Sequence, residues 1–217
     1  MTRTNYQKFL LLAKNELNDN LFLQTVFSDP ESPQYFTKIR RNNTKFIQYS
    51  VKKLNYHQGV FIDIFPFDKT PDDQLLRKVH SIKIRIYSYL FVMSSNLDFY
   101  QGFNNYMDIV KFILIRLIHY ILKPIPRTVL YTLLDKERRR YNNKHTKSNI
   151  LLPMFRGKYT HTKHLFPVKK IQFEDIQVNG PNNCDAYLSG LYGDYMPPPP
   201  PHKRPGHSPV VLEINVD

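Results

Sequence analysis

The chain is poor in the residues on which several familiar kinds of site depend. It has one cysteine, Cys184, among 217 residues, which excludes an internal disulfide framework and any cysteine-based zinc site within one chain. Its seven glycines form no phosphate-binding loop and no dinucleotide fingerprint. There is no G-x-S-x-G elbow and no recognisable arrangement of cysteine and histidine. Nucleophilic catalysis therefore finds no support, and we expect Cys184 to pack in the interior.

Long hydrophobic runs are also missing. The apolar run at residues 9–13 is too short for a secretory signal and is followed at once by Lys14, so we expect the protein to stay in the cytoplasm. Residues 107–122 are apolar but are interrupted by Lys111 and Arg116, and they fall short of the roughly 20 apolar residues that a spanning helix needs. Two interpretations of this segment stay open: a helix lying at a bilayer interface and an ordinary core helix.

Charge is abundant and mostly positive. The formal net charge is +13 and the pI is about 9.7. Residues 107–147 alone hold ten basic and three acidic side chains, a net charge of +7. We therefore expect an anionic partner, and a peripheral contact with the inner face of the membrane fits this expectation. No DNA-binding or RNA-binding motif accompanies the charge, so we expect no specific nucleic acid.

The hydrophobic pattern predicts an α/β protein. The spacing of Tyr6, Phe9 and Ala13 indicates a first helix, with Thr4 and Gln7 as its capping box. Short extended runs come next, and residues 41–43 are typical of a turn between two of them. The expected strands are 21–27, 35–40, 45–51, 59–65 and 171–178, the last being one strand or one arm of a hairpin; the expected helices are 75–93, 107–122, 129–142 and 185–191.

The length suits one domain. We expect that domain to span residues 1–196, with a basic helical insertion at about 75–147, and a proline-rich tail to span residues 197–217. Residues 197–201 are consecutive prolines, which favours an extended or polyproline conformation, either as an ordered strap or as a loose end.

A carboxylate stands inside the strongest strand signal, GVFIDIFPFD at residues 59–68. Side chains alternate across a strand, so Asp63 shares a face with Phe61 and Phe65, and both faces look buried. A buried carboxylate needs a cation, a metal or several hydrogen-bond donors. Asp63 is therefore either a functional residue or the partner of Lys38 or Arg40 in a structural ion pair. Asp68, Asp72 and Asp73 follow the helix-breaking Pro66, and we expect them to act in turns or helix caps.

Several short motifs occur together in one order. Residues 38–40 read Lys-Ile-Arg and are followed by Thr44, and the strand around Asp63 comes next. Further matches are Phe166-Pro167, Phe173-Glu174, Tyr187-Leu188, Tyr192-Gly193-Asp194-Tyr195, Pro197-Pro198 and His207. In this order and spacing the chain resembles the LicD family of cholinephosphotransferases, with relatives among the fukutin-type sugar-phosphate transferases. The resemblance covers residues 5–207.

The resemblance implies a nucleotidyltransferase-like fold, a mixed sheet with flanking helices. It implies transfer of phosphocholine or a related phospho-alcohol from a CDP-choline-like donor to a cell-surface glycan acceptor, assisted by Mg²⁺ or Mn²⁺. Asp63 would be the catalytic residue and metal ligand. Lys38, Arg40 and Thr44 would contact the donor, while Tyr192 and Asp194 would close the site. For Lys38 and Arg40 the alternative is solvent-facing charge on an edge strand, and for residues 192–195 it is a helix-ending glycine with packed tyrosines.

The family's metal-binding aspartate cluster has no counterpart here. In the family this cluster lies just before the segment that Met1 to Tyr6 resembles, so we expect an N-terminally truncated fold. The apolar face of the first helix would then be exposed, or it would be covered by a complementing chain. The alternative function is a non-catalytic remnant that binds anionic lipid or nucleotide.

Overall fold

The computed structural model describes residues 1–98, 102–103, 105–147, 150–153, 159–200, 204 and 208–214. Helices and short strands alternate along these ranges, so the fold is α/β in the general sense. All the strand pairs described are antiparallel and form four small sheets, and one continuous mixed sheet is not found in these ranges. The nucleotidyltransferase-like fold stays a prediction. Pro201 and His207, the latter a residue of the family motifs, lie outside the described residues.

The first helix, α1, spans Arg3–Glu16. Its N-cap is Thr2, whose side-chain oxygen accepts a hydrogen bond from the backbone N–H of Asn5 at 3.3 Å. The capping box predicted at Thr4 and Gln7 is therefore wrong. The helix begins earlier because Thr2 satisfies an N-terminal N–H, and Arg3 is then already helical with its side chain buried. Tyr6 and Ala13 are buried, as the predicted helical spacing requires.

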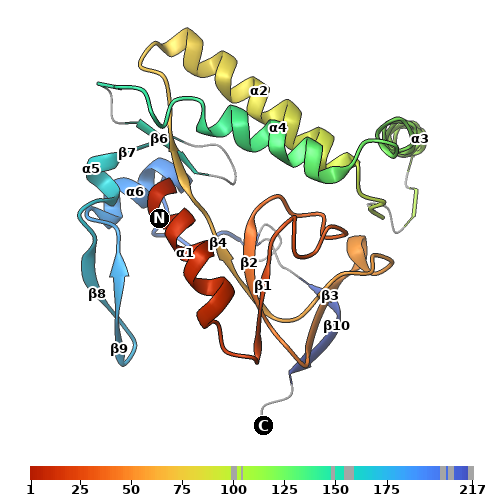
Figure 1. Cartoon of the computed structure of the whole chain (residues 1–217), viewed down its shortest axis with the longest axis horizontal. Coiled ribbons are helices and arrows are strands. Elements are labelled where there is room, and N and C mark those ends of the chain that lie inside the picture. Colours follow the sequence, from red (N-terminus) through yellow and green to blue (C-terminus); the bar gives the residue numbers. More distant parts are fainter. Residues whose placement is uncertain are drawn as a thin grey trace.

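The sheet at the centre of Figure 1 has three strands, in the order β1, β2, β4. They span Leu21–Gln24, Thr37–Arg41 and Phe61–Ile64. The middle strand, β2, places Lys38 opposite Asp63 and Arg40 opposite Phe61. The turn predicted after β2 is confirmed, with Asn43 in the left-handed region at φ 58°.

The other strands form small separate sheets. The strand β3 (Thr44–Gln48) pairs with β10 (Pro209–Ile214) and leads into the 3-10 helix η1 (Tyr49–Val51). A further sheet joins β5 (Phe67–Lys69), β6 (Ile150–Pro153) and β7 (Thr160–His161). The strands β8 (Lys169–Phe173) and β9 (Ile176–Gly180) form a hairpin. The prediction of one strand or one hairpin arm over residues 171–178 is therefore wrong, because the turn of the hairpin, with Glu174 at φ 51°, falls inside that run. The pairing of β10 shows that this part of the tail is an ordered strap.

Three long helices follow the central sheet: α2 (Gln74–Met93), α3 (Tyr106–Leu122) and α4 (Arg127–Arg139). Figure 1 shows α2 and α4 side by side across one side of the molecule, with α3 near one end of this pair. Phe91 of α2 and Leu130 of α4 pack with Val26, and Ile84 and Leu134 pack with Leu152. The helices therefore share their core with the strands and loops around them. Among the described residues, no helix combines the length and hydrophobicity required to cross a membrane.

Two short helices complete the chain, α5 (Thr162–Leu165) and α6 (Cys184–Tyr192). Cys184 is half-buried at the start of α6. Its thiol contacts the carbonyl oxygen of Pro181 at 3.5 Å, which fits a packing role.

A groove of about 630 Å³ lies between α1 and β1. Its lining is largely apolar and includes Leu10, Leu17, Phe22 and Phe27. The apolar face of the first helix is therefore covered in part, since Tyr6 and Ala13 are buried, while Leu10 and Leu17 line the groove.

Candidate functional site

The expected site contains one ion pair on the central sheet. The Nζ atom of Lys38 lies 2.6 Å from Oδ1 of Asp63, across the β2–β4 register. The interpretation of Asp63 as the partner of Lys38 is thus confirmed. The prediction that both faces of β4 are buried is wrong, because the Asp63 side chain is 32% exposed on one face and Ile62 is 60% exposed on the other.

The ammonium group of Lys38 is buried next to aromatic side chains. Its ammonium group lies 3.3 Å from the centre of the Phe61 ring and 5.0 Å from that of Phe36. Burial lowers the pKa of Lys38 to about 8, although the hydrogen bond to Asp63 and its charge act in the opposite direction. The alternative of a solvent-facing lysine on an edge strand is wrong, because β2 is the middle strand and Lys38 is buried.

Arg40 is also buried, and it is held by the protein itself. Its Nε donates a hydrogen bond to Oε1 of Gln24 at 2.7 Å, and its Nη1 donates to the carbonyl oxygen of Gly59, also at 2.7 Å. Burial lowers the pKa of Arg40. These bonds join β1, β2 and the start of the β4 segment, so Arg40 positions the sheet around the Lys38–Asp63 pair.

Thr44 has a similar structural role in the turn between β2 and β3. Its hydroxyl donates a hydrogen bond to the carbonyl oxygen of Arg41 at 2.8 Å and accepts one from the backbone N–H of Val60 at 2.9 Å. The hydroxyl therefore ties β3 to the segment that enters β4.

Tyr192 and Asp194 lie at the end of α6 and are exposed. Figure 1 shows α6 beside α5, on the other side of α1 from the central sheet. Gly193 ends the helix with φ 77°, as the simpler interpretation of this motif has it. The structure thus joins Lys38, Arg40 and Thr44 around β4 but does not bring Tyr192 or Asp194 to them.

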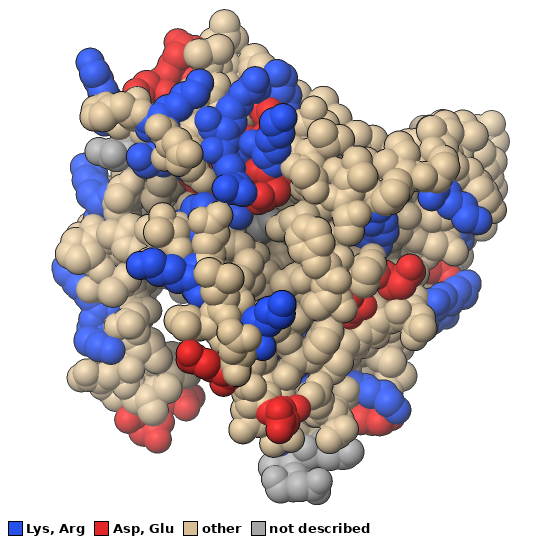
Figure 2. Space-filling view, viewed as in Figure 1, with Lys and Arg blue, Asp and Glu red and all other residues tan. Residues whose placement is uncertain are grey.

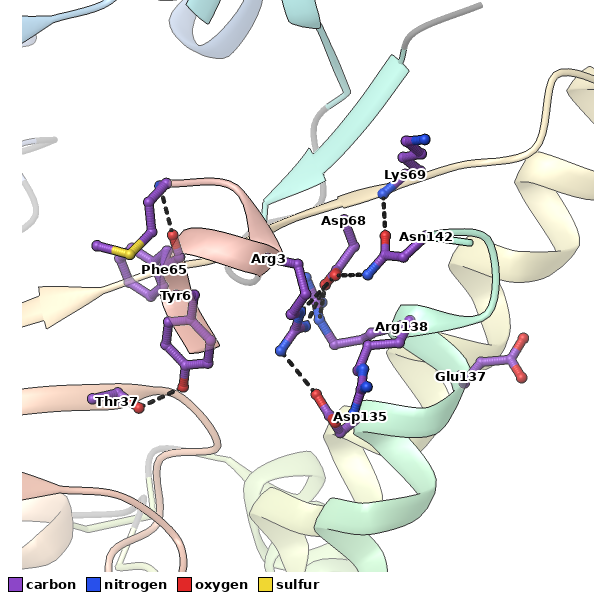
Figure 3. A network of polar contacts seen from close by, with 12 residues as sticks. Arg3, Tyr6, Thr37, Phe65, Asp68, Lys69, Asp135, Glu137, Arg138 and Asn142 are labelled. Atoms are coloured by element: carbon purple, nitrogen blue, oxygen red, sulfur yellow. Dashed lines mark hydrogen bonds and ion pairs between the residues drawn. The ribbon is translucent and has the colours of Figure 1, made fainter. Parts of the chain in front are cut away.

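A second polar cluster, centred on Asp68, was missed. The side chain of Asp68 is 1% exposed and accepts two hydrogen bonds from Arg3, from Nε at 2.7 Å and from Nη2 at 2.5 Å. Arg138 of α4 lies 3.4 Å away, and Asn142 donates a hydrogen bond at 2.7 Å. Figure 3 shows these side chains converging on Asp68, with Asp135 on the far side of Arg3.

The turn or capping role expected for Asp68 is therefore wrong. Asp73 does cap α2, accepting a hydrogen bond from the backbone N–H of Leu76 at 2.8 Å, and Asp72 accepts one from Lys147. Asp68 belongs instead to β5, which begins directly after Pro66. The sequence does contain a sign that Asp68 is buried, because Asp68 ends the same apolar run, residues 59–68, that contains Asp63. The argument that a buried carboxylate needs a partner therefore applies to both residues.

Charge in the Asp68 cluster is balanced within the protein. Burial acts to lower the pKa of Arg3, but the hydrogen bond and charge of Asp68, together with Asp135, raise it above its ordinary value. Burial lowers the pKa of Arg138. The cluster joins α1, β5 and α4, and its carboxylates already contact cations, so a structural role explains it.

The edge of β4 that faces away from β2 has a defined geometry. The carbonyl oxygen of Val60 accepts a hydrogen bond from Arg41 of β2, so the peptide groups of the alternate residues Phe61, Asp63 and Phe65 point to the other edge. Met1 lies on that side: its amino group donates to the carbonyl oxygen of Phe65 at 3.1 Å, and its own carbonyl oxygen accepts from Phe67 at 2.8 Å. Thr2 and Phe67 form a parallel bridge.

Among the described residues, Asp63 is the one carboxylate on the central sheet that could take part in holding a divalent metal. In the described ranges, no three His, Cys, Asp or Glu side chains gather as ligands. One oxygen of Asp63 already contacts an ammonium group. A hard cation held by protein usually has one or two carboxylates together with phosphate and water oxygens.

Comparisons of the chain with protein-family models, with curated proteins and with solved structures found no match.

Proposed function

We propose that this chain forms the larger part of a phosphotransferase resembling the LicD family. The reaction would transfer phosphocholine, or a related phospho-alcohol, from a CDP-linked donor to a cell-surface glycan precursor. The observation that supports the proposal is the Lys38–Asp63 pair, which joins two of the motifs in the resemblance and lies on β4, the last strand of its sheet among the described residues.

Lys38 and Asp63 have separate roles in this proposal. Lys38, with a pKa of about 8, is mostly charged at neutral pH and would attract the diphosphate of the donor once Asp63 turns to another partner. Asp63 keeps about a third of its side chain exposed and is the group that reaches solvent. Arg40 and Thr44 position these two residues. Contact of Tyr192 and Asp194 with substrate stays a prediction.

Completion of the site requires a further strand. The further strand would lie along the edge of β4 that faces away from β2 and would form hydrogen bonds with the peptide groups of Phe61 and Asp63. It would run parallel to β4, as Met1 and Thr2 do beside Phe65 and Phe67. Carboxylates on that strand would stand next to Asp63. The Mg²⁺ or Mn²⁺ implied by the resemblance belongs to this completed site, so we assign no catalytic step to a metal on the present residues.

The first experiment tests which polypeptide supplies the further strand beside β4. The mass of the protein isolated from its native host, compared with 25.9 kDa, shows whether the same polypeptide supplies it. A protein of this mass that copurifies with a second chain would place the strand on a complementing chain.

The native protein is then assayed for CMP release from CDP-choline in the presence of Mg²⁺. We expect Asp63→Asn to lower the rate by about a hundredfold or more. The matched control is Asp175→Asn, which changes an exposed carboxylate in the turn between β8 and β9 and should leave the rate unchanged. Equal rates for Asp63→Asn and the control would refute the proposed role.

The second candidate is a non-catalytic module that binds anionic lipid or nucleotide. The observation that favours it is the neutralisation of Asp63 by Lys38, which leaves no carboxylate pair on the described part of the sheet. Binding without CMP release from the native protein would favour this candidate over the transferase.

A further inference from the structure

The helix α3 presents its apolar side to solvent. Ile113, Leu117 and Ile121, which are spaced one turn apart, are 57%, 54% and 63% exposed. Leu114 and Ile109 extend the same side and are 52% and 40% exposed. A surface helix of a globular protein normally turns this side to the core. The interpretation of α3 as an ordinary core helix is therefore wrong.

Polar contacts fix this orientation. The Arg116 side chain donates a hydrogen bond to Oδ1 of Asn96, just beyond the end of α2. Nδ1 of His119 contacts the carbonyl oxygen of Met93 at 3.3 Å. Arg116 and His119 are half-buried and Leu122 is buried, so the side of α3 that carries them faces the protein, and the side with Ile113, Leu117 and Ile121 faces outward.

The helix α2 has a second apolar stripe that faces away from the core. Its buried side carries Ile84 and Phe91. The opposite side holds large apolar residues that are between 41% and 69% exposed, namely Leu75, Val79, Ile82, Ile86 and Tyr89. Tyr89 lies one turn before Met93, so this stripe ends next to α3.

The charges beside these stripes are almost all positive. The exposed side chains of Lys78, Lys83 and Arg85 flank the stripe on α2, and α2 contains no aspartate or glutamate. Lys111, with a side chain 59% exposed, and Lys123 border the apolar side of α3, where Asp108 is the one acidic residue of the helix. In Figure 2 most of the visible surface over α3, at the upper right, is neither basic nor acidic; lysine and arginine atoms lie at its margin, and acidic atoms lie below it.

The apolar stripes and the positive charges beside them together favour a membrane over another protein as the partner of this surface. An interfacial helix on a membrane has an apolar side bordered by lysine and arginine, and α3 and the stripe of α2 have this arrangement. Tyr106 and Tyr120 are 76% and 66% exposed on the same helix, and tyrosine is favoured at the level of lipid headgroups.

We propose that α3, with the adjoining stripe of α2, lies in the plane of an anionic bilayer. The apolar side chains would enter the boundary between headgroups and acyl chains, and the bordering lysines and arginines would contact anionic headgroups. This proposal does not depend on the transferase activity, and its test measures binding alone.

The test is cosedimentation of the full chain with vesicles of phosphatidylcholine alone and of phosphatidylcholine mixed with phosphatidylglycerol. We expect binding to the anionic vesicles that falls as salt is raised, and weak binding to the neutral ones. Leu117→Glu should weaken binding about tenfold or more, because it removes an inserted apolar side chain and adds a repelled charge. The matched control is Leu11→Glu on α1, where the leucine is 71% exposed outside this surface and binding should be unchanged.

Further measurements keep the test decisive. Circular dichroism establishes that Leu117→Glu and Leu11→Glu are folded. A third variant, Leu117→Lys, separates the loss of the apolar side chain from the repulsion of charge, because it removes apolar surface while adding positive charge. Weaker binding by Leu117→Lys would support insertion. Protein that stays in the supernatant with anionic vesicles would overturn the proposal. A dimer that Leu117→Glu converts to a monomer, without vesicle binding, would show that a second copy covers this surface and would also overturn it.

Discussion

Replacement of Asp68 by asparagine should be among the most destabilising single changes in this protein. Asp68 is the carboxylate that Arg3 contacts through two nitrogen atoms and that Arg138 approaches to 3.4 Å. Asparagine keeps the shape and can still accept a hydrogen bond from Asn142, but the negative charge is lost. The guanidinium groups of Arg3 and Arg138 are both buried, and the carboxylate left beside them would be that of Asp135, which contacts Arg3.

The magnitude follows from burial. Loss of one partner from a buried ion pair costs about 3–5 kcal/mol, because the remaining charge is left without compensation. Asp68 is 1% exposed and Arg3 is 9% exposed, so solvent screens this loss little. A domain is stable by only about 5–15 kcal/mol in total, so Asp68→Asn should remove a large part of its stability.

Urea denaturation followed by far-ultraviolet circular dichroism measures this difference in the free energy of unfolding. The control is Asp98→Asn, which breaks an ion pair of 2.7 Å with Lys53; the Asp98 side chain is 14% exposed and that of Lys53 is 65% exposed. The control should cost about 1 kcal/mol, because the lysine that loses its partner stays in solvent. If Asp68→Asn cost no more than Asp98→Asn, the reasoning from burial would be wrong.

Two further predictions concern the central sheet and α6. Burial lowers the pKa of Lys38 in the folded protein to about 8, from 10.5. At this group the unfolded chain therefore binds more protons between these pH values, so the contribution of Lys38 to the free energy of unfolding should rise with pH across that window by up to about 3 kcal/mol. Urea titrations at several pH values should show that Lys38→Met lacks this rise, and an equal rise in the variant would assign it to other groups. Gly59→Ala should lower the melting temperature, at a cost of about 1–3 kcal/mol, because the added Cβ would overlap the carbonyl oxygen of Arg41. The same change at Gly190, in α6, meets no atom within 4 Å and should raise stability by up to about 1 kcal/mol; destabilisation at both glycines would count against this distinction.

The sequence predicts the helices better than the strands. For α2 and α3 the apolar periodicity places both ends within one residue, because a long helix repeats its pattern over several turns. The strands are shorter than expected: β1 ends at Gln24 where the extended run reached residue 27. Residues 25–28 instead form a turn in which Thr25 and Ser28 bond each other's backbone and side chains, a local competition that hydrophobicity does not reveal.

For the candidate site, the sequence predicts the pair but not its surroundings. The possible partnership of Lys38 with Asp63 follows from charge and from strand alternation. The burial of Arg40 does not follow, because its partners Gln24 and Gly59 come from other parts of the chain. The Asp68 cluster was hidden for the same reason: it depends on long-range contacts between residues near positions 3, 68 and 138, which periodicity within one element does not predict.

The strand β10 has a consequence for how the chain avoids self-association. It covers one edge of β3 through a ladder from Thr44 to Gln48, although most of its own side chains are exposed. Its contribution is therefore mainly to occupy backbone donors and acceptors that would otherwise be open to a strand of another molecule. The pairing adds little apolar burial, and the cross-strand ion pair of Lys45 with Glu213 is about half exposed. Because few buried contacts hold β10, we expect it to be among the first elements to open, which would expose the edge of β3 to a strand of another molecule.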